Sequence, residues 1–534
     1  MSEVHWHRGW DALRFENRFT RELPADPETS NETRQVYEAC FSRVSPKPVR
    51  APHRVAVSEE VASELGIDEQ LIESQQFAEV FSGNLLHPEM DPFAMCYGGH
   101  QFGNWAGQLG DGRAINLCEV IDVDGRHQML QLKGAGPTPY SRFADGLAVL
   151  RSSVREFLCS EAMHHLGVPT TRALSLVLTG ESVTRDMFYD GHPKQELGAV
   201  VCRVAPSFVR LGSFQIFHSR QDYTTLKTLA DYTIRHDFPE LGEPSHQVYA
   251  EWFGEICRRT ADLMVHWMRV GFVHGVMNTD NLSILGQTID YGPYGWLEDF
   301  DPNWTPNTTD AEGRRYRYGH QPQIAQWNLA QFGSALLPLV DNNVELLQEG
   351  LRSYVASFES GWNQMMASKI GLDQFQGDDD ALLFEDLLEL LQRAETDMTL
   401  FFRLLANVPR DAEPQTVPDH LSEAYYQPDE IGAEVREQTA SWFERYRDRL
   451  TRAGVTDADR KLKMDSVNPL YVLRNYLAQL AIDRSEKGDH GGVTELLDVL
   501  RRPYTPQPGR EAYAEKRPEW ARHRAGCSML SCSS

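Results

Sequence analysis

Asn281 and Asp290 are two oxygen-bearing side chains on either side of a short apolar run, residues 282–285. The pattern predicts a strand pair between them, so that rigid elements would bring the two side chains together. Amide and carboxylate oxygens held in this way suit a hard divalent cation that keeps open positions for phosphate oxygens. Protein kinases build their metal site from the same parts, a catalytic-loop Asn and the Asp of a D-F-G turn. The sequence therefore predicts a metal site that acts on a nucleotide phosphate.

The residues before Asn281 depart from the kinase pattern at one position. Kinase loops read H-x-D-x-x-x-x-N, and their Asp is the catalytic base. His274 and Asn281 keep the spacing of seven, but Val276 stands where the Asp would be. A carboxylate is present instead at Asp280, and residues 290–292, Asp-Tyr-Gly, stand in for D-F-G. The metal ligands are therefore retained, and Asp280 is the candidate base.

A glycine-rich segment and a hairpin precede this loop in the chain. Glycines at 98–99 and at 107, 110 and 112 come before two strand-like runs, 114–123 and 128–132, which Asp124-Gly125 joins as a hairpin. Glycines let the backbone approach a ligand and point N–H groups at phosphate. Their spacing is not the G-x-G-x-x-G of kinases, and an ordinary loop is the alternative interpretation.

Lys133 and Glu156 follow the hairpin in the order that a kinase would use. Lys133 ends the second strand, and Glu156 lies in the first half of a helix predicted over 148–166. A Lys–Glu pair between strand and helix holds the lysine toward phosphate. Taken alone, Lys133 would be a solvated side chain and Glu156 an exposed carboxylate on the helix surface. The order of the elements favours the functional interpretation.

Two arginines, Arg203 and Arg210, come after strands predicted over 171–178 and 197–204. Two guanidinium groups can hold a polyphosphate through bidentate contacts. A pair of surface ion pairs is the alternative for these residues.

The rest of the chain is predominantly helical, which sets the predicted architecture. Helices are expected over 225–236, 247–270, 325–370 (two helices), 381–406, 431–453, 469–482 and 492–500. The fold class is therefore α+β. We expect a protein-kinase-like, two-lobed fold with a small antiparallel-sheet N-lobe and a large, mostly helical C-lobe with a C-terminal helical extension. The expected segments are an N-terminal arm and extension (1–90), the N-lobe (91–220), the C-lobe (221–410) and a helical extension with a Cys-containing tail (411–534).

The composition is that of a globular protein with several subdomains. The chain has 534 residues, 41% of them hydrophobic and 24% charged, and a formal net charge of −25. That charge argues against a nucleic-acid binder that relies on general attraction to phosphate. No run approaches the roughly 20 apolar residues of a membrane span, and the start lacks the apolar segment of a secretory signal. We expect a cytoplasmic protein with no nucleic-acid or membrane partner.

Four motifs resemble the selenoprotein O (SelO/YdiU) family, and the resemblance covers nearly the whole chain. They are residues 110–113 (GDGR), 133–136 (KGAG), 151–157 (RSSVREF) and 274–293. The resemblance implies a kinase-like fold that lacks the usual base and binds ATP in a flipped orientation. It further implies Mg²⁺- or Mn²⁺-dependent transfer of AMP from ATP to Ser, Thr or Tyr hydroxyls of proteins, with release of pyrophosphate, and for some members transfer of UMP.

The resemblance also assigns roles to single residues. It places metal on Asn281 and Asp290 and the base on Asp280. Nucleotide contacts fall on Gly110, Gly112, Arg113, Lys133, Asp145, Gly146, Arg203 and Arg210, to which Glu156 and Asp290 are added as partners of the lysine and of the metal. The chain departs from the family at Phe143-Ala144 and Leu147, which weakens the assignment of Asp145 and Gly146.

Two other functions are compatible with the same residues. The first is an ordinary phosphotransferase that uses Asp280 in place of the missing base. The second is a non-catalytic, nucleotide-binding scaffold that responds to redox conditions. The eight cysteines include no C-x-x-C pair, which argues against a zinc or disulfide scaffold. Cys527 and Cys532 lie in a polar tail, where a redox role and inert thiols are both open.

Overall fold

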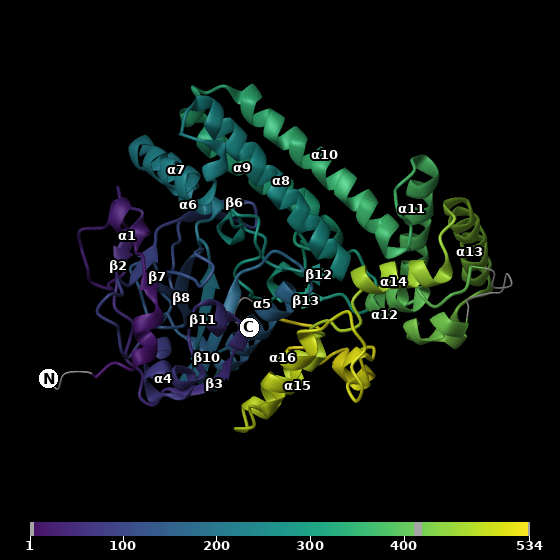
Figure 1. Cartoon of the computed structure of the whole chain (residues 1–534), viewed down its shortest axis with the longest axis horizontal. Coiled ribbons are helices and arrows are strands. Elements are labelled where there is room, and N and C mark those ends of the chain that lie inside the picture. The colour runs from purple at the N-terminus through teal and green to yellow at the C-terminus, as the bar shows by residue number, and fades with distance from the viewer. Residues whose placement is uncertain (1–4, 411–418, 532–534) are drawn as a thin grey trace.

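A large antiparallel sheet forms the half of the molecule drawn in purple and blue in Figure 1. The structure is a computed structural model that describes residues 5–410 and 419–531. The sheet has nine strands, and β1 (Arg14–Phe15) and β9 (Ala148–Val149) pair with β7 and β11 off the main path. The main order is β2 (Phe41–Arg43), β4 (Phe93–Met95), β7 (Ala114–Ile121), β8 (His127–Lys133), β11 (Lys194–Ala205), β10 (Arg172–Arg185) and β3 (His53–Val57).

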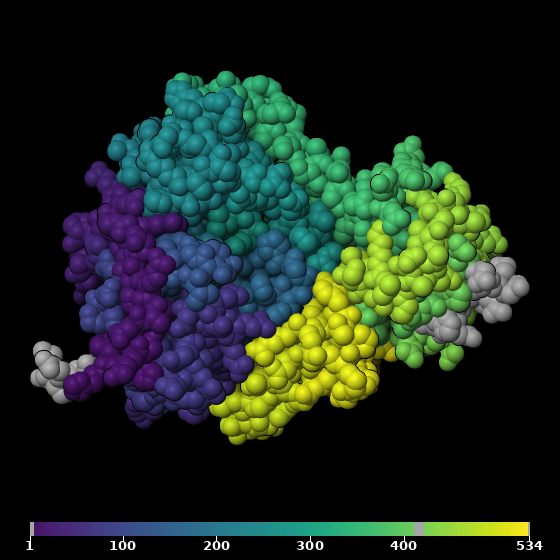
Figure 2. Space-filling model, viewed as in Figure 1, coloured from purple at the N-terminus to yellow at the C-terminus, as the bar shows by residue number. Residues whose placement is uncertain are grey.

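The predicted hairpin is confirmed as β7–β8. Gly125 takes a φ of 82°, the left-handed conformation that a tight hairpin turn requires. Lys133 closes β8 and is paired with Ala114 on one side and Val201 on the other. The predicted strands over 171–178 and 197–204 are also present, and they extend further into the β10–β11 hairpin. Strands β1, β2 and β3 of the N-terminal segment belong to this sheet, and Figure 2 shows that segment in purple beside the blue atoms of the sheet.

Helix α5 (Leu150–His165) packs against this sheet, as predicted. Its apolar residues Val154, Phe157, Leu158 and Ala162 are fully buried. Glu156 lies on the same helix and is also buried, so the helix brings a carboxylate into the core. Burial of a carboxylate is costly unless cations and donors surround it, and the site described below provides them.

The other half of the molecule is helical. The long helices α8 (His246–Val270) and α10 (Val344–Lys369) run side by side (Figure 1). The remaining longer helices are α6 (Leu211–Ser219), α7 (Tyr223–Asp237), α9 (Gln321–Leu336), α11 (Asp378–Arg393), α12 (Met398–Leu405), α13 (Ala433–Ala453), α14 (Asp457–Val467), α15 (Asn475–Ser485) and α16 (Gly491–Leu500). Short helices α1 (Arg18–Glu22), α2 (Glu59–Glu64), α3 (Glu69–Glu73) and α4 (Gln75–Ser82) accompany the sheet. Within the described ranges, no helix combines the length and the apolarity needed to cross a membrane.

Two helix predictions are wrong in detail, and two of the longer helices, α6 and α14, were not predicted. The single helix expected over 381–406 is two helices, because Asp397 caps a new one by accepting from the backbone N–H of Leu400 at 2.9 Å. Helix α14 was not expected, although Thr456 caps it in the same way. The helix expected from residue 469 begins at Asn475, because the backbone N–H groups of 470 and 471 donate to the carbonyl of Pro503.

A buried arginine ties the C-terminal helices to the rest of the helical half. Arg474, just before α15, donates to Asp397 at 2.7 Å and to Glu298 at 2.9 Å. All three side chains are at most 5% exposed. The charges therefore depend on one another, since removal of one leaves another uncompensated in a dry interior.

The variant Arg474→Met should destabilise the protein by about 3–5 kcal/mol, because Asp397 and Glu298 would remain buried without their cation. Urea denaturation followed by circular dichroism measures this loss. The matched control is Arg452→Met, an exposed arginine on α13, which should unfold like the unmodified chain. Equal stability of the two variants would contradict the assigned role of Arg474.

Candidate active site

Asp290 is the meeting point of three cations that come from separate elements. Arg203 of β11 donates to Oδ1, and Arg210, which precedes α6, donates to Oδ2. Lys133 at the end of β8 lies with its Nζ 3.7 Å from Oδ1. Burial alone would raise the pKa of Asp290, but Arg210, Arg203 and Lys133 hold it well below its usual range. Asp290 is therefore a carboxylate anion at neutral pH.

Glu156 joins the same cluster from α5. It accepts from Lys133 on one oxygen and from Arg203, at 3.1 Å, on the other. Glu156 is 2% exposed and Lys133 is 8% exposed, so the pair is buried. Burial lowers the pKa of Lys133, and Glu156 partly offsets that effect. The predicted Lys–Glu pair is present, and neither residue is the solvated side chain that was its alternative.

The two arginines are also interior residues and not surface ion pairs. Arg203 is 0% and Arg210 is 1% exposed. Arg203 also donates to Gln131, its neighbour across the β8–β11 pairing. The guanidinium of Arg210 lies 4.4 Å from the ring centroid of Tyr97. Stacking and hydrogen bonds thus fix the directions of both guanidinium groups.

Residues 274–290 are connected by hydrogen bonds and not by the predicted strand pair. Only the single bridge Leu282–Thr288 forms there, and its two residues also bond to segments outside the loop. Instead, His274 Nε2 contacts the carbonyl of Ile289 at 2.9 Å, and its Nδ1 accepts from the N–H of Val276 at 3.3 Å. The histidine therefore links the two ends of the loop.

Arg210 and Asn281 complete this linkage. One nitrogen of Arg210, Nη1, donates both to the carbonyl of Asp280, at 2.8 Å, and to Asp290. The amide nitrogen of Asn281 donates to the carbonyl of Val276 at 2.9 Å, so the amide oxygen faces away from Val276. Asp290 itself has a φ of 58°, which is rare for a residue with a side chain. The backbone around the predicted metal ligands is therefore held in a specific, uncommon conformation.

Asp280 presents a carboxylate without a strong partner. Its Oδ1 is buried and has no hydrogen-bond partner, and its Oδ2 is 3.5 Å from Gln101 Nε2. Burial raises the pKa of Asp280 to about 7. A carboxylate with a raised pKa near neutrality can accept a proton and release it again, which suits the predicted base.

The glycine loop lies against residues that immobilise it. Gly110 has a φ of 80°, and a Cβ there would lie 2.3 Å from the ring of Tyr140. The carbonyl of Gly112 accepts from Ser141, and that of Asp111 accepts from Thr138 at 2.7 Å. A Cβ on Gly112 would lie 2.9 Å from the carbonyl oxygen of Tyr140, so close packing requires both glycines, whatever they contribute to ligand binding.

A small pocket adjoins Lys133 and contains Arg113 and Ser153 in its lining. Ser153 Oγ is buried without a hydrogen-bond partner, and Ser153 lies in the first turn of α5. Arg113 forms no ion pair within the described part of the chain. Two cations, a hydroxyl and the N–H groups of a helix start are a set of donors suited to an anion such as phosphate.

Asp145 and Gly146 contact residues other than those of the cluster around Asp290. Both carboxylate oxygens of Asp145 accept from Arg185 of β10, each at 2.8 Å. Gly146 has a φ of 71° and packs on Gly136, where a Cβ would be 2.2 Å from the Gly136 carbonyl carbon. Their role in nucleotide binding stays a prediction.

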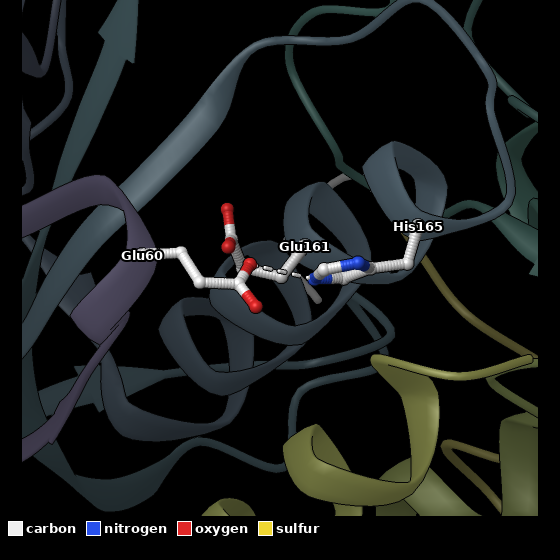
Figure 3. Close-up of side chains that lie close together, drawn as sticks. All are labelled: Glu60, Glu161 and His165. Carbon is white, nitrogen blue, oxygen red and sulfur yellow. Dashed lines mark ion pairs between the residues drawn. The ribbon is translucent and has the colours of Figure 1, made fainter. Parts of the chain in front are cut away.

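The donors predicted at residues 281 and 290 are one amide oxygen and one ionised carboxylate, which is the chemistry of a hard divalent cation. Both oxygens of Asp290 accept from arginines in this structure, so an ion bound there would share or displace those contacts. A second group of potential ligands, Glu60, Glu161 and His165, lies together in Figure 3. There, Glu161 already accepts two bonds from Arg172, at 2.9 and 2.7 Å. That group is an ion-pair network on α2 and α5, in which the guanidinium of Arg172 supplies the positive charge.

Strands β5 (Gly98–Gln101) and β6 (Asn104–Gln108) form a hairpin. The sequence did not predict that this hairpin contacts the predicted catalytic loop, residues 274–290. The N–H of His100 donates to Thr279 Oγ1 at 2.8 Å, and the N–H of Phe102 donates to Tyr316 at 2.9 Å. The hydroxyl of Tyr316 donates in turn to Asn278 at 2.6 Å. The glycines at 98–99 were the only sequence signal, and they do not identify a partner.

Of the two cysteines near the C-terminus, Cys527 is among the described residues. Cys527 is buried, and burial raises the pKa of its thiol to about 11, so it is protonated at neutral pH. Cys532 lies outside the described residues, and its redox role stays a prediction.

Comparison with known proteins identifies the relatives of the chain. The model of the family described as "Protein adenylyltransferase SelO" matches residues 26–501. The "Protein nucleotidyltransferase YdiU" of Rhodopirellula baltica is 63% identical over 537 residues, which cover 98% of this chain and 99% of that protein. The proteins of the same name from Aromatoleum aromaticum and an Azoarcus species are 60% and 59% identical, again over 98% of this chain and 99% of each relative.

The contact between the hairpin and the loop gives a prediction. Tyr316→Phe leaves the N–H of Phe102 only the longer bond to Asn278 Oδ1, at 3.3 Å. Hydrogen–deuterium exchange across 98–108 should then become faster, while exchange across α8 should not change. If exchange in the hairpin is the same in both proteins, the hydroxyl of Tyr316 does not hold it in place.

Proposed function

The chain belongs to the family of the protein adenylyltransferase SelO, and we propose that it transfers AMP from ATP to Ser, Thr or Tyr hydroxyls of other proteins and releases pyrophosphate. The observation that carries this proposal is the buried cluster in which Lys133, Arg203 and Arg210 surround Asp290, next to Asp280. Transfer of a nucleotidyl group needs positioned cations that offset the charge on phosphate.

The arrangement of Lys133 and Glu156 supports a kinase-like, two-lobed fold as the structural basis of this activity. In such a fold the sheet with α5 is the N-lobe, and the helices from α6 onward belong to the C-lobe and its extension. Asn281 and Asp290 would hold Mg²⁺ or Mn²⁺. Such an ion, when bound, offsets negative charge on the phosphate oxygens.

The flipped orientation of ATP agrees with the distribution of anion-binding groups. In this orientation the α-phosphorus lies beside Asp280 and Asp290, and the terminal phosphate extends away from them. In this proposal the terminal phosphate approaches the side of the cluster on which Arg113, Lys133 and Ser153 line a small pocket. Arg203 and Arg210 remain beside Asp290 and hold the phosphates nearer to the reaction.

The reaction then needs one proton acceptor. The oxygen of the acceptor hydroxyl bonds to the α-phosphorus, the bond from that phosphorus to the bridging oxygen breaks, and pyrophosphate leaves. Asp280 takes the proton of the hydroxyl, since its Oδ2 has only a contact of 3.5 Å to Gln101. UTP in place of ATP would give UMP transfer by the same steps. We place the reaction in the cytoplasm, with no role for nucleic acid or membrane.

Two labels on ATP distinguish the proposal from the phosphotransferase. Purified protein, Mg²⁺ or Mn²⁺ and acceptor proteins are incubated with α-³²P-ATP or γ-³²P-ATP. We expect label in protein from the α position only, and none after EDTA removes the metal. Label from the γ position only would show phosphate transfer. Saturable ATP binding without any transfer would instead favour the non-catalytic scaffold.

Variants test the separate roles. Lys133→Ala and Asp290→Asn should abolish transfer, because each removes a charge that positions the phosphates. Asp280→Asn should slow transfer by about 10²–10⁴-fold, the typical contribution of a general base, while ATP binding is retained. Arg452→Ala serves as the control with full activity. Full activity in any of the three site variants would refute the role of that residue.

A further inference from the structure

The carboxylate of Asp280 lies beneath the β5–β6 hairpin. A Cβ on Gly99 would be 2.3 Å from Asp280 Oδ1, so the backbone of the hairpin lies directly against it. The hairpin is also bonded to the loop through the N–H groups of His100 and Phe102, which donate to Thr279 and Asn278. A hydroxyl that reaches Asp280 therefore passes beside this hairpin.

An arginine-rich turn lies at the tip of the hairpin. Arg314, Arg315 and Arg317 form no ion pair within the described residues. Asp310, in the same turn, uses its carboxylate to accept from the backbone N–H groups of Arg315, at 3.0 Å, and Tyr316, at 2.7 Å. Nε and Nη2 of Arg315 are buried and lack hydrogen-bond partners. The positive charge of Arg315 is therefore not neutralised by an ion pair with any described residue, and a Cβ on Gly103 would lie 3.4 Å from its guanidinium carbon, which places the group at the tip of the hairpin.

Aromatic rings connect this turn to the hairpin. The guanidinium of Arg315 lies 4.7 Å from the ring centroid of Trp327, and Trp327 lies 5.5 Å from His100. His100 is 5.1 Å from Trp105. Phe102 and Trp105 are each 37% exposed. Large exposed rings beside unpaired arginines are the composition of a protein-binding surface.

We propose that Phe102, Trp105, Arg314, Arg315 and Arg317, here named the acceptor patch, bind acidic segments that flank the modified hydroxyl of the acceptor protein. This inference rests on the AMP-transfer function proposed above and names its class of substrate. The net charge of the chain is −25, so an acidic segment is repelled by the surface as a whole and is attracted only where cations are unpaired. The attraction acts over about 8–10 Å at physiological ionic strength, which confines the selection to residues close to the hydroxyl.

Peptide binding tests the patch without any catalysis. Two fluorescein-labelled peptides share a central Tyr and differ only in flanks of Asp and Glu or of Lys. Fluorescence anisotropy should show that the acidic peptide binds at least about fivefold more tightly, and that added salt removes the difference. Equal binding of the two peptides would overturn the proposal. So would tighter binding of a single-stranded oligonucleotide of matched charge.

Kinetics with a charge-reversed variant separate docking from chemistry. Arg314→Glu/Arg317→Glu should raise the KM for the acidic peptide on the order of tenfold and leave kcat and the KM for ATP unchanged. The same variant should gain activity on the Lys-flanked peptide. The control Arg50→Glu/Arg452→Glu changes the net charge equally at two exposed arginines and should behave like the unmodified chain. Thermal melting confirms that both variants fold.

The outcomes distinguish this inference from the function on which it rests. An unchanged preference for the acidic peptide in the charge-reversed variant overturns the acceptor patch, while AMP transfer itself still stands. A raised KM for ATP would show that the arginines contact the nucleotide, and it would also overturn the acceptor patch. Absence of AMP transfer to any acceptor overturns the proposed function, and the docking inference is then decided by the anisotropy measurement alone.

Discussion

The buried ion cluster around Asp290 is the constraint on which the rest of the structure depends. Lys133, Arg203 and Arg210 come from β8, from β11 and from the start of α6, and Glu156 comes from α5. Each of these charges would be costly in the interior without the others. The sheet, the helix and the loop 274–290 are therefore stable together only in an arrangement that gathers these charges. Stability and the proposed chemistry use the same contacts.

Local sequence patterns predicted the parts of the site that a single element determines. The turn at Asp124-Gly125 set the β7–β8 hairpin, and the end of that hairpin placed Lys133. The apolar face of α5 was evident from its periodicity, but the same periodicity would place Glu156 on the surface. Only the order of elements pointed to the Lys–Glu pair, and the burial of both residues confirms the pair. The α+β class followed from the same patterns.

Long-range contacts were beyond such patterns. The N–H groups of His100 and Phe102 bond to Thr279 in the catalytic loop and to Tyr316 beyond it, which are 179 and 214 positions away in the chain. No local sequence signal encodes such a bond, so the sequence did not predict that the β5–β6 hairpin lies over Asp280. The strand pair between Asn281 and Asp290 failed for a related reason, because the backbone of that loop bonds to other segments. Asp397 and Thr456, which cap α12 and α14, were local signals of a helix start. The predicted helix boundaries followed the apolar pattern instead.

The central claim is that the cluster around Asp290 positions the α-phosphate of ATP. The most direct measurement is a crystal structure with Mn²⁺ and α,β-methylene-ATP, in which anomalous scattering locates the metal. We predict manganese on Asn281 and Asp290, the α-phosphate beside it, and the γ-phosphate in the pocket of Arg113, Lys133 and Ser153. A γ-phosphate beside Asp280, with the α-phosphate farther away, would contradict the account and indicate a phosphotransferase.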